Sequence, residues 1–351
     1  MSTVTVPKVK PTRPWKRTPK QQALMAANLL ISAVVSYFVV LATPMKGKLA
    51  YLAIFFIAVI AINFAESYFK SGLAAAKDSI ATSFAAAGLI IAVVPIFSIL
   101  FTIFDRGRAG LNFNLFLHDM KSNGPNDPLG QGGLLHALVG SGIMVGIALL
   151  ISLPIGILTA IYLTEIKGIY SRPIKFLVQA MSGVPSIVAG LFILSAIVFP
   201  ITKSSSGLMG GLALSILMIP TIARTSEEVL LLIPNDLREA GVALGGTQWR
   251  TISLIVVPAA KSGLITATIL GLARVAGETA PLLLTMGGAD ALNLNPFNGN
   301  SSAIPFYVWK NFSLGTETSI ARAWAGVLVL MIIVLFFFSL TRFLSNRKGR
   351  V

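Results

Sequence analysis

The chain has 351 residues, of which 55% are hydrophobic and only 12% are charged. An ordinary soluble domain carries about 25% charged residues, so this composition indicates a membrane protein. The net charge is +15 and cysteine is absent, which excludes disulfide bonds and thiol chemistry. The two histidines, His118 and His136, are too few to suggest a metal site.

Apolar segments long enough to cross about 30 Å of hydrocarbon recur along the chain. The first of them is too long for a signal-peptide core and is followed at once by another, so we expect an uncleaved anchor. Residues 1–22 form a basic tail rich in Lys, Pro and Thr, predicted to be disordered until it meets the membrane. The eight predicted spans are 23–43, 49–68, 80–104, 136–163, 174–200, 207–223, 262–286 and 323–343.

The distribution of basic residues predicts the orientation in the membrane. Most of the 28 Lys and Arg residues fall in segments on the same side as the N-terminus. This asymmetry predicts that both termini are cytoplasmic. The remaining role of the positive charge is attraction to anionic membrane lipids. Nucleic-acid binding is the competing interpretation, but the basic tail directly adjoins a span, so we predict no nucleic-acid partner.

The first two spans differ from the others in having few Gly or Pro residues, and a short polar linker, Lys70 to Ser79, follows them. We therefore predict a two-helix extension at 23–79 and a membrane domain at 80–345. Gly and Pro interrupt the later spans, and such breaks are tolerated in lipid where neighbours or a cavity satisfy the freed backbone groups. Helix packing through small residues is the simpler alternative to a transport pathway.

The polar segment 224–261 separates two of the predicted spans on the cytoplasmic side. Within it, Asp236 lies three residues before Glu239, a spacing that is typical of a capping box at the start of a helix near Leu237. We therefore predict a first short helix on the membrane surface. A helical hairpin without further function remains the alternative.

A second short helix is predicted in the same segment. Gly245 is expected to end the first helix, because glycine adopts the left-handed conformation at a helix end at little cost. Thr247 is then placed to cap the second helix, in which Trp249 makes apolar contacts, and Pro258 is expected to end it.

Two ionisable residues lie inside the seventh predicted span. Arg274 and Glu278 are four residues apart, which places them on one face of a continuous helix. Charged groups at such depth are costly and face a partner or a wet cavity. Gly277, Thr279 and Pro281 allow an irregular backbone with free N–H groups beside them, and this combination suits a tetrahedral oxyanion. The alternative is an Arg–Glu pair that only neutralises itself.

The polar segment resembles the E-A-A-x3-G-x9-I-x-L-P signature of ABC-importer permeases. In that family the two short helices dock on a nucleotide-binding subunit and transmit its closure to the spans. Gly241 replaces an alanine of the signature and should loosen the helix by up to about 1 kcal/mol. No Walker A motif is present, so ATP and Mg²⁺ are expected on a partner ATPase and no cofactor in this chain. The matching residues are Glu239, Ala240, Gly245, Ile255 and Pro258.

Three further stretches resemble the PstA type of phosphate-importer permease: R-V-A-G-E-T-A-P-L-L from Arg274, G-V-P-S-I-V-A-G-L-F at 183–192, and R-T-S-E at 224–227. The resemblance implies an all-α integral membrane protein with a six-span type I permease core and two extra N-terminal helices. It implies that phosphate passes Arg274, Glu278 and Thr279. Arg224 and Glu227 would lie toward the cytoplasmic end of that route.

The same resemblance implies a bacterial cytoplasmic-membrane complex. Its expected partners are a homologous permease of the PstC type, two ATP-binding subunits of the PstB type and a phosphate-binding protein of the PstS type. The outer loops, 105–135 and 287–322, would meet that binding protein. Three alternatives remain: a permease for another oxyanion such as molybdate or sulfate, a membrane scaffold or sensory partner, and a proton-coupled transporter.

Overall fold

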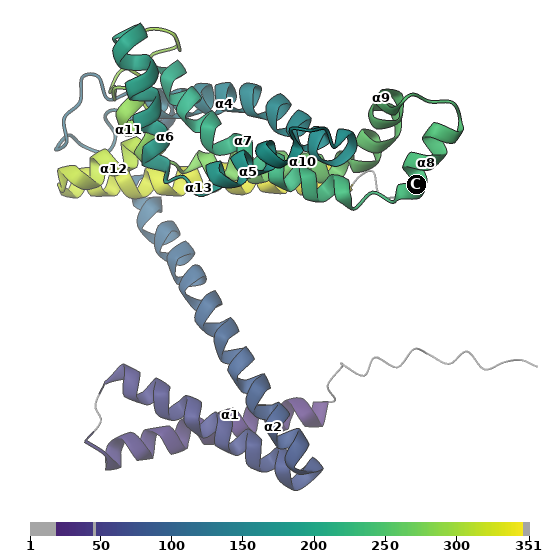
Figure 1. Ribbon diagram of the computed structural model, residues 1–351. Helices are drawn as coiled ribbons and strands as arrows, with labels where there is room; N and C mark the ends of the chain where they lie inside the picture. The colour runs from purple at the N-terminus through teal and green to yellow at the C-terminus, as the bar shows by residue number, and fades with distance from the viewer. Residues whose placement is uncertain (1–18, 45–46, 347–351) are drawn as a thin grey trace, which may run out of the picture. The chain divides into compact units, whose positions relative to one another are not determined.

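A computed structural model describes residues 19–44 and 47–346, so residues 1–18 of the predicted tail lie outside the described part of the chain (Figure 1). Within the described ranges the chain is helical, and its one β-type pairing is an isolated bridge between Gly287 and Ser301. The chain divides into two compact units, Met1–Leu100 and Phe101–Val351.

The first unit contains α1 (Pro19–Ala42) and the greater part of α2 (Lys48–Gly107). At Gly72 the backbone of α2 leaves the helical region, with φ of 83° and ψ of −175°, so α2 consists of two helices joined at a single residue. The break falls inside the predicted linker from Lys70 to Ser79, the rest of which is helical. Its alanine-rich second half favours helix, and glycine supplies the positive φ that the break requires.

A polar cluster joins α1 to α2 inside the first unit. Glu66 accepts hydrogen bonds from Asn28 of α1 and, at 2.6 Å, from Lys70. Asn63 donates to Ser83 across the Gly72 break at 3.4 Å. Because these side chains satisfy one another, the cluster fixes how the helices of the extension pair.

The second unit is a helical bundle whose central helix is α7. Its elements in chain order are η1 (Arg108–Gly110), α3 (Asn114–Leu117), α4 (Leu135–Ile161), η2 (Tyr162–Ile166), α5 (Ser171–Ser182), α6 (Ser186–Ile193), η3 (Leu194–Thr202), α7 (Gly207–Leu231), α8 (Asn235–Ala243), α9 (Gln248–Thr251), η4 (Ile252–Val256), α10 (Val257–Ala276), α11 (Ala280–Thr285), α12 (Ile304–Leu314) and α13 (Glu317–Asn346). Helix α7 contacts α4, α5, α6, α10 and α11.

Ile222 of α7 lies at the centre of the main core and is completely buried. A Cβ atom added at Gly156 of α4 would lie 2.7 Å from its Cγ2 atom, and one added at Gly271 of α10 would lie 2.8 Å from its Cγ1 atom. Only glycine therefore allows both neighbouring helices to approach α7 this closely, as small residues do in membrane bundles.

Each of the eight predicted spans falls in helical segments, but two of them are broken within the span. By length and apolar composition, the described residues contain six helices able to cross a membrane, or seven with the bent pair α5 and α6–η3. That pair bends by 106° within predicted span 174–200, since Gly183 and Pro185 interrupt it. The break at Gly277 divides predicted span 262–286 into α10 and α11. Eight spans are predicted and seven are found because α2, divided at Gly72, is counted once and holds two of the predicted spans.

Candidate transport route and coupling loop

Helix α8 begins earlier than predicted and without the expected capping box. It starts at Asn235 after Pro234, and neither Asp236 nor any other side chain caps its first turn. Asp236 instead lies within that turn, where a carboxylate complements the positive end of the helix dipole. The prediction that Asp236 and Glu239 form a capping box is therefore wrong.

The junction between α8 and α9 matches the prediction closely. Gly245 has a φ of 80°, and its N–H group bonds to the carbonyl of Val242 at 2.9 Å, while that of Gly246 bonds to Gly241 at 3.1 Å. These two bonds form the Schellman motif that ends a helix. Thr247 then caps α9 by accepting a hydrogen bond from the N–H of Arg250. Both predicted helix signals are confirmed.

Gly241 is buried where α8 packs on α9 and η4. An added Cβ atom would lie 2.6 Å from Cγ2 of Thr251 and 2.8 Å from Cδ1 of Ile255. The glycine that replaces the signature's alanine is therefore matched by larger side chains opposite it.

Pro258 does not end the second helix as predicted. It lies in the first turn of α10, and the π-helical segment η4 carries the chain from α9 into α10 without a loop. A wider turn before proline accommodates its missing N–H group and its ring. The segment formed by α8, α9 and η4 (residues 235–256), called the coupling loop below, is thus continuous with the membrane helix α10.

Apolar side chains of the coupling loop are exposed. Leu244 is 87% exposed and Trp249 is 58% exposed, so more than half of the surface of each residue is left uncovered by this chain. Glu239 and Ala240 are exposed on α8 as well. Helices α8 and α9 lie together at the end of the second unit opposite α12 (Figure 1), a surface that fits a separate protein.

The structure changes the geometry expected for Arg274 and Glu278. Helix α10 ends at Ala276, so Glu278 lies in the break before α11 and the prediction that both residues share one helix face is wrong. Arg274 is exposed, Glu278 is half-buried, and among the described residues no ion pair joins them. The amide of Glu278 is also not free, because it donates to the carbonyl of Val275 at 3.2 Å.

The segments that carry the phosphate-permease resemblance meet in space. Helix α6, from the 183–192 stretch, contacts α11, from the stretch that begins at Arg274. A Cβ atom at Gly190 would lie 2.7 Å from the Cα atom of Pro281, so backbones touch at this crossing. The motif glycine is therefore explained by close helix approach.

Arg224 and Glu227 lie on α7, nearer the coupling loop than Arg274. Ile222 of α7 contacts Gly271 of α10, and the two helices run antiparallel. Counting residues outward from that contact separates Arg224 and Arg274 by about 7 Å along the bundle, at about 1.5 Å per residue.

Two ion pairs that sequence reasoning missed surround this end of α7. Glu227 accepts from Lys175 of α5 at 2.7 Å, and Arg224 lies 3.6 Å from Glu228. A third missed pair joins Glu165 of η2 to Arg238 of α8 at 2.8 Å. No sequence spacing signals the pairs of Glu227 and Glu165, since their members are 52 and 73 residues apart.

A buried arginine organises the outer loop that precedes α4. Arg322 of α13 is 2% exposed and donates to carbonyl groups of the 124–131 segment. The acceptors are Gly124 at 3.1 Å, Asp127 at 2.9 Å, Pro128 at 3.1 Å and Gln131 at 3.0 Å. Arg322 therefore ties four carbonyls of this loop together, and Asn112 and Asn114 add bonds to the carbonyls of Leu129 and Gly130.

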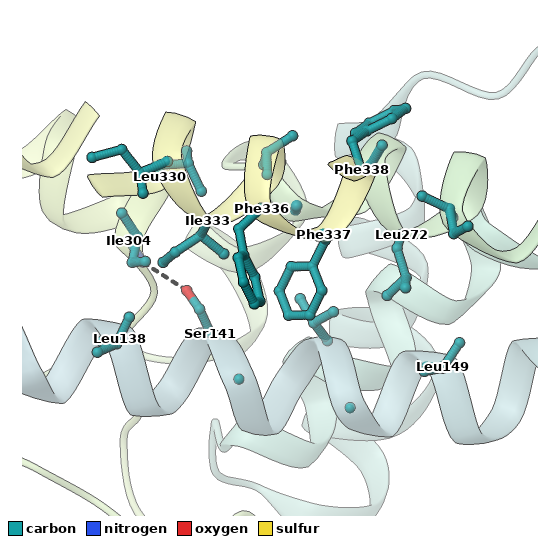
Figure 2. Close-up of a pocket in the computed structure, with 18 residues that line it drawn as sticks. Leu138, Ser141, Leu149, Leu272, Ile304, Leu330, Ile333, Phe336, Phe337 and Phe338 are labelled. Carbon is teal, nitrogen blue, oxygen red and sulfur yellow. Dashed lines mark hydrogen bonds between the residues drawn. The ribbon is translucent and has the colours of Figure 1, made fainter. Parts of the chain in front are cut away.

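A pocket of about 610 Å³ lies between α4, α10 and α13 (Figure 2). Its lining carries no charged residue, and the hydroxyl of Ser141 is already used as the acceptor for the N–H of Ile304 at 2.8 Å. Ala273 and Ala276 line it, whereas Arg274 between them does not. The pocket therefore offers no cationic group for an oxyanion, and its lining is almost entirely apolar.

Comparison with known proteins agrees with this architecture. Residues 152–350 match the sequence profile of the family described as the inner membrane component of binding-protein-dependent transport systems. A chain of the MetNI methionine ABC transporter, solved in inward-facing conformations, superposes with a TM-score of 0.50, covering 62% of this chain and 95% of that chain at 19% identity. The fold and the family match thus define a non-catalytic, multi-pass permease component of a bacterial ABC-type importer.

More similar relatives narrow the family. The phosphate transport system permease protein PstA 1 of Mycobacterium tuberculosis is 35% identical over 280 residues, covering 78% of this chain and 90% of that protein. The protein PstA of Haemophilus influenzae is 40% identical over 262 residues, covering 71% and 87%. The chain belongs to the PstA family of phosphate transport system permeases.

Proposed function

We propose that this chain, together with a homologous permease of the PstC type, forms the membrane path for inorganic phosphate in an ATP-driven importer. The observation that carries the proposal is Arg274, an exposed guanidinium in the last turn of the membrane helix α10, whose other charged residue, Lys261, lies in its first turns. Such a charge is costly in lipid unless it faces a partner subunit or a wet route. The absence of an ion pair between Arg274 and Glu278 among the described residues supports an external anion as its partner.

Phosphate selectivity is assigned to Glu278 and Thr279 in the break between α10 and α11. Hydrogen phosphate carries a proton that a carboxylate can accept, whereas sulfate at neutral pH carries none. Thr279 adds a hydroxyl beside it. Arg224 and Glu227 belong to the cytoplasmic end of the route, since α7 places them between Arg274 and the coupling loop.

The coupling loop is the docking site for one of two ATP-binding subunits of the PstB type, which carry ATP and Mg²⁺. Exposed Glu239, Ala240 and the apolar side chains around Leu244 support this role. Gly241, Gly245, Ile255 and Pro258 set the shape of the loop and its continuity with α10. A binding protein of the PstS type delivers phosphate to the outer loops, and both termini face the cytoplasm. We assign residues 80–345 to the permease domain and 23–79 to a membrane extension.

The test is labelled phosphate uptake and ATP hydrolysis in proteoliposomes that contain this chain and its neighbouring subunits, comparing wild type with Arg274→Ala. Uptake lost while ATP hydrolysis persists supports a place on the route. The matched control is Arg172→Ala, which removes an exposed arginine at the start of α5. If uptake and hydrolysis fall together, Arg274 is part of the coupling or the packing. If the wild type transports molybdate or sulfate instead, the cargo assignment fails.

A further inference from the structure

The ion pair between Arg238 and Glu165 has the geometry of a rigid junction. The Nε atom of Arg238 donates to Oε2 of Glu165 at 2.9 Å, and Nη2 donates to Oε1 at 2.8 Å. The side chain of Glu165 is 5% exposed and that of Arg238 is 22% exposed. A planar, two-pronged and largely buried pair of this kind fixes both distance and orientation.

The other donors of Arg238 bind the end of α7 and the start of α8. Nη2 also donates to the carbonyl of Leu230 at 2.9 Å, and Nη1 donates to the carbonyl of Ile233 and to Oδ1 of Asn235. The carbonyl of Leu230 lies in the last turn of α7 and that of Ile233 just after it, so Arg238 binds the backbone at the end of this helix.

A further hydrogen bond joins η2, the segment that contains Glu165, to α9. Nε2 of Gln248 donates to the backbone carbonyl of Glu165 at 2.7 Å. Residues of η2, α7, α8 and α9 therefore meet at Glu165 and Arg238.

The order of the elements along the chain shows which helices are joined to the coupling loop by the backbone. Helix α7 leads directly into α8 through residues 232–234, and α9 leads through η4 into α10, so both of those spans are covalently continuous with the coupling loop. Helix α4 has no such continuity. At its inner end, Ala160 and Ile161 share an apolar cluster with Ile252 and Val256 of η4, and the bonds of Glu165 in η2 add the polar link to α8 and α9.

We infer that Glu165 and Arg238 are positioning residues that make the coupling helices and the inner end of α4 move as one body. The inference rests on the coupling role proposed above for α8 and α9. A displacement of α8 by the ATPase then reaches α4 as directly as it reaches α7 and α10. Lysine at position 238 could not reproduce this, because it lacks the fixed planar fork.

The functional test measures phosphate transported per ATP hydrolysed in the reconstituted complex. Glu165→Gln and Arg238→Lys should each assemble with the ATPase and retain hydrolysis. Their transport ratio should fall about fivefold or more, the lower end of usual coupling effects between sites. Glu66→Gln is the matched control, since it removes the carboxylate of another ion pair, in the extension, and should leave the ratio unchanged. An unchanged ratio in Glu165→Gln overturns the inference, and so does loss of ATPase assembly, because the pair would then only shape the docking surface.

A cargo-independent test uses spin labels, for which the cysteine-free chain gives no background. Labels are attached through Leu158→Cys on α4 and Asp236→Cys on α8, both exposed positions, after checking that the labelled complex hydrolyses ATP. The distance between them should be narrowly distributed and unchanged by ATP in an otherwise wild-type chain, and should broaden or shift in Glu165→Gln. The same narrow distance in Glu165→Gln with and without ATP overturns the inference. A wild type that moves no phosphate refutes the cargo proposal alone, since the label distances still decide this one.

Discussion

Gly241→Ala restores the alanine of the permease signature, yet we expect it to destabilise the coupling loop. The new Cβ atom would lie 2.6 Å from Cγ2 of Thr251 and 2.8 Å from Cδ1 of Ile255, whereas carbon atoms in contact prefer about 3.5–4.0 Å. Either these side chains or the helices that carry them must therefore shift by about 1 Å to restore ordinary contact. Overpacking of this kind costs about 1–3 kcal/mol, and the higher helix propensity of alanine returns about 1 kcal/mol.

The expected net loss is about 1 kcal/mol in the local stability of α8. Hydrogen exchange of the α8 amides in the detergent-solubilised chain measures this loss, because local opening controls their exchange. A loss of about 1 kcal/mol speeds exchange about fivefold. Thr251→Ala removes the opposing methyl and a hydroxyl that is buried without a hydrogen-bond partner, so the double variant should recover protection. Slower exchange in Gly241→Ala alone would refute this reasoning and show that helix propensity decides the position.

Three further variants test other parts of the account. Arg322→Ala should lower the thermal stability of the purified chain and speed hydrogen exchange in the 124–131 loop, because it removes a buried donor from four carbonyls, of which those of Gly124 and Pro128 keep a backbone donor; the expected cost is about 1–3 kcal/mol, and unchanged exchange there would contradict this. Glu278→Gln should reduce discrimination of phosphate over sulfate in uptake competition, and unchanged discrimination would remove Glu278 from the selectivity proposal. Tyr307→Phe should leave thermal stability unchanged or raised at pH 7, because its hydroxyl is buried without a partner in the described chain. Burial raises the pKa of Tyr307 from 10.0 to about 12, so wild type should lose stability relative to that variant as pH rises through this window, and equal pH profiles would contradict the assignment.

Sequence alone was sufficient where the signal is local. The length of the apolar segments locates the membrane helices. Gly245 ends α8 because glycine tolerates a positive φ, and Thr247 caps α9 with its hydroxyl. Two of the stretches that carry the family resemblance, 183–192 and 274–283, include residues of α6 and α11, which touch where Gly190 meets Pro281. Each of these features depends on residues within a few positions of one another.

Features that depend on distant residues or on backbone continuity were not predictable. Nothing in the sequence around Glu165 indicates a partner 73 residues away. The spacing of Arg274 and Glu278 indicates one helix face only if the helix continues, and α10 ends between them. Pro258 was interpreted as a terminator because the π-helical turn that accommodates it has no clear sequence signal. The need for glycine at position 241 was likewise not predictable, because the side chain that fills the space beside it belongs to Thr251 on another helix.

The most direct measurement is uptake of labelled phosphate by the wild-type complex in proteoliposomes loaded with ATP, with an excess of unlabelled sulfate or molybdate outside. The account predicts uptake that requires ATP hydrolysis by the partner subunit and that neither competing oxyanion suppresses. Uptake that persists without the ATPase, or transport of sulfate or molybdate in place of phosphate, would contradict it.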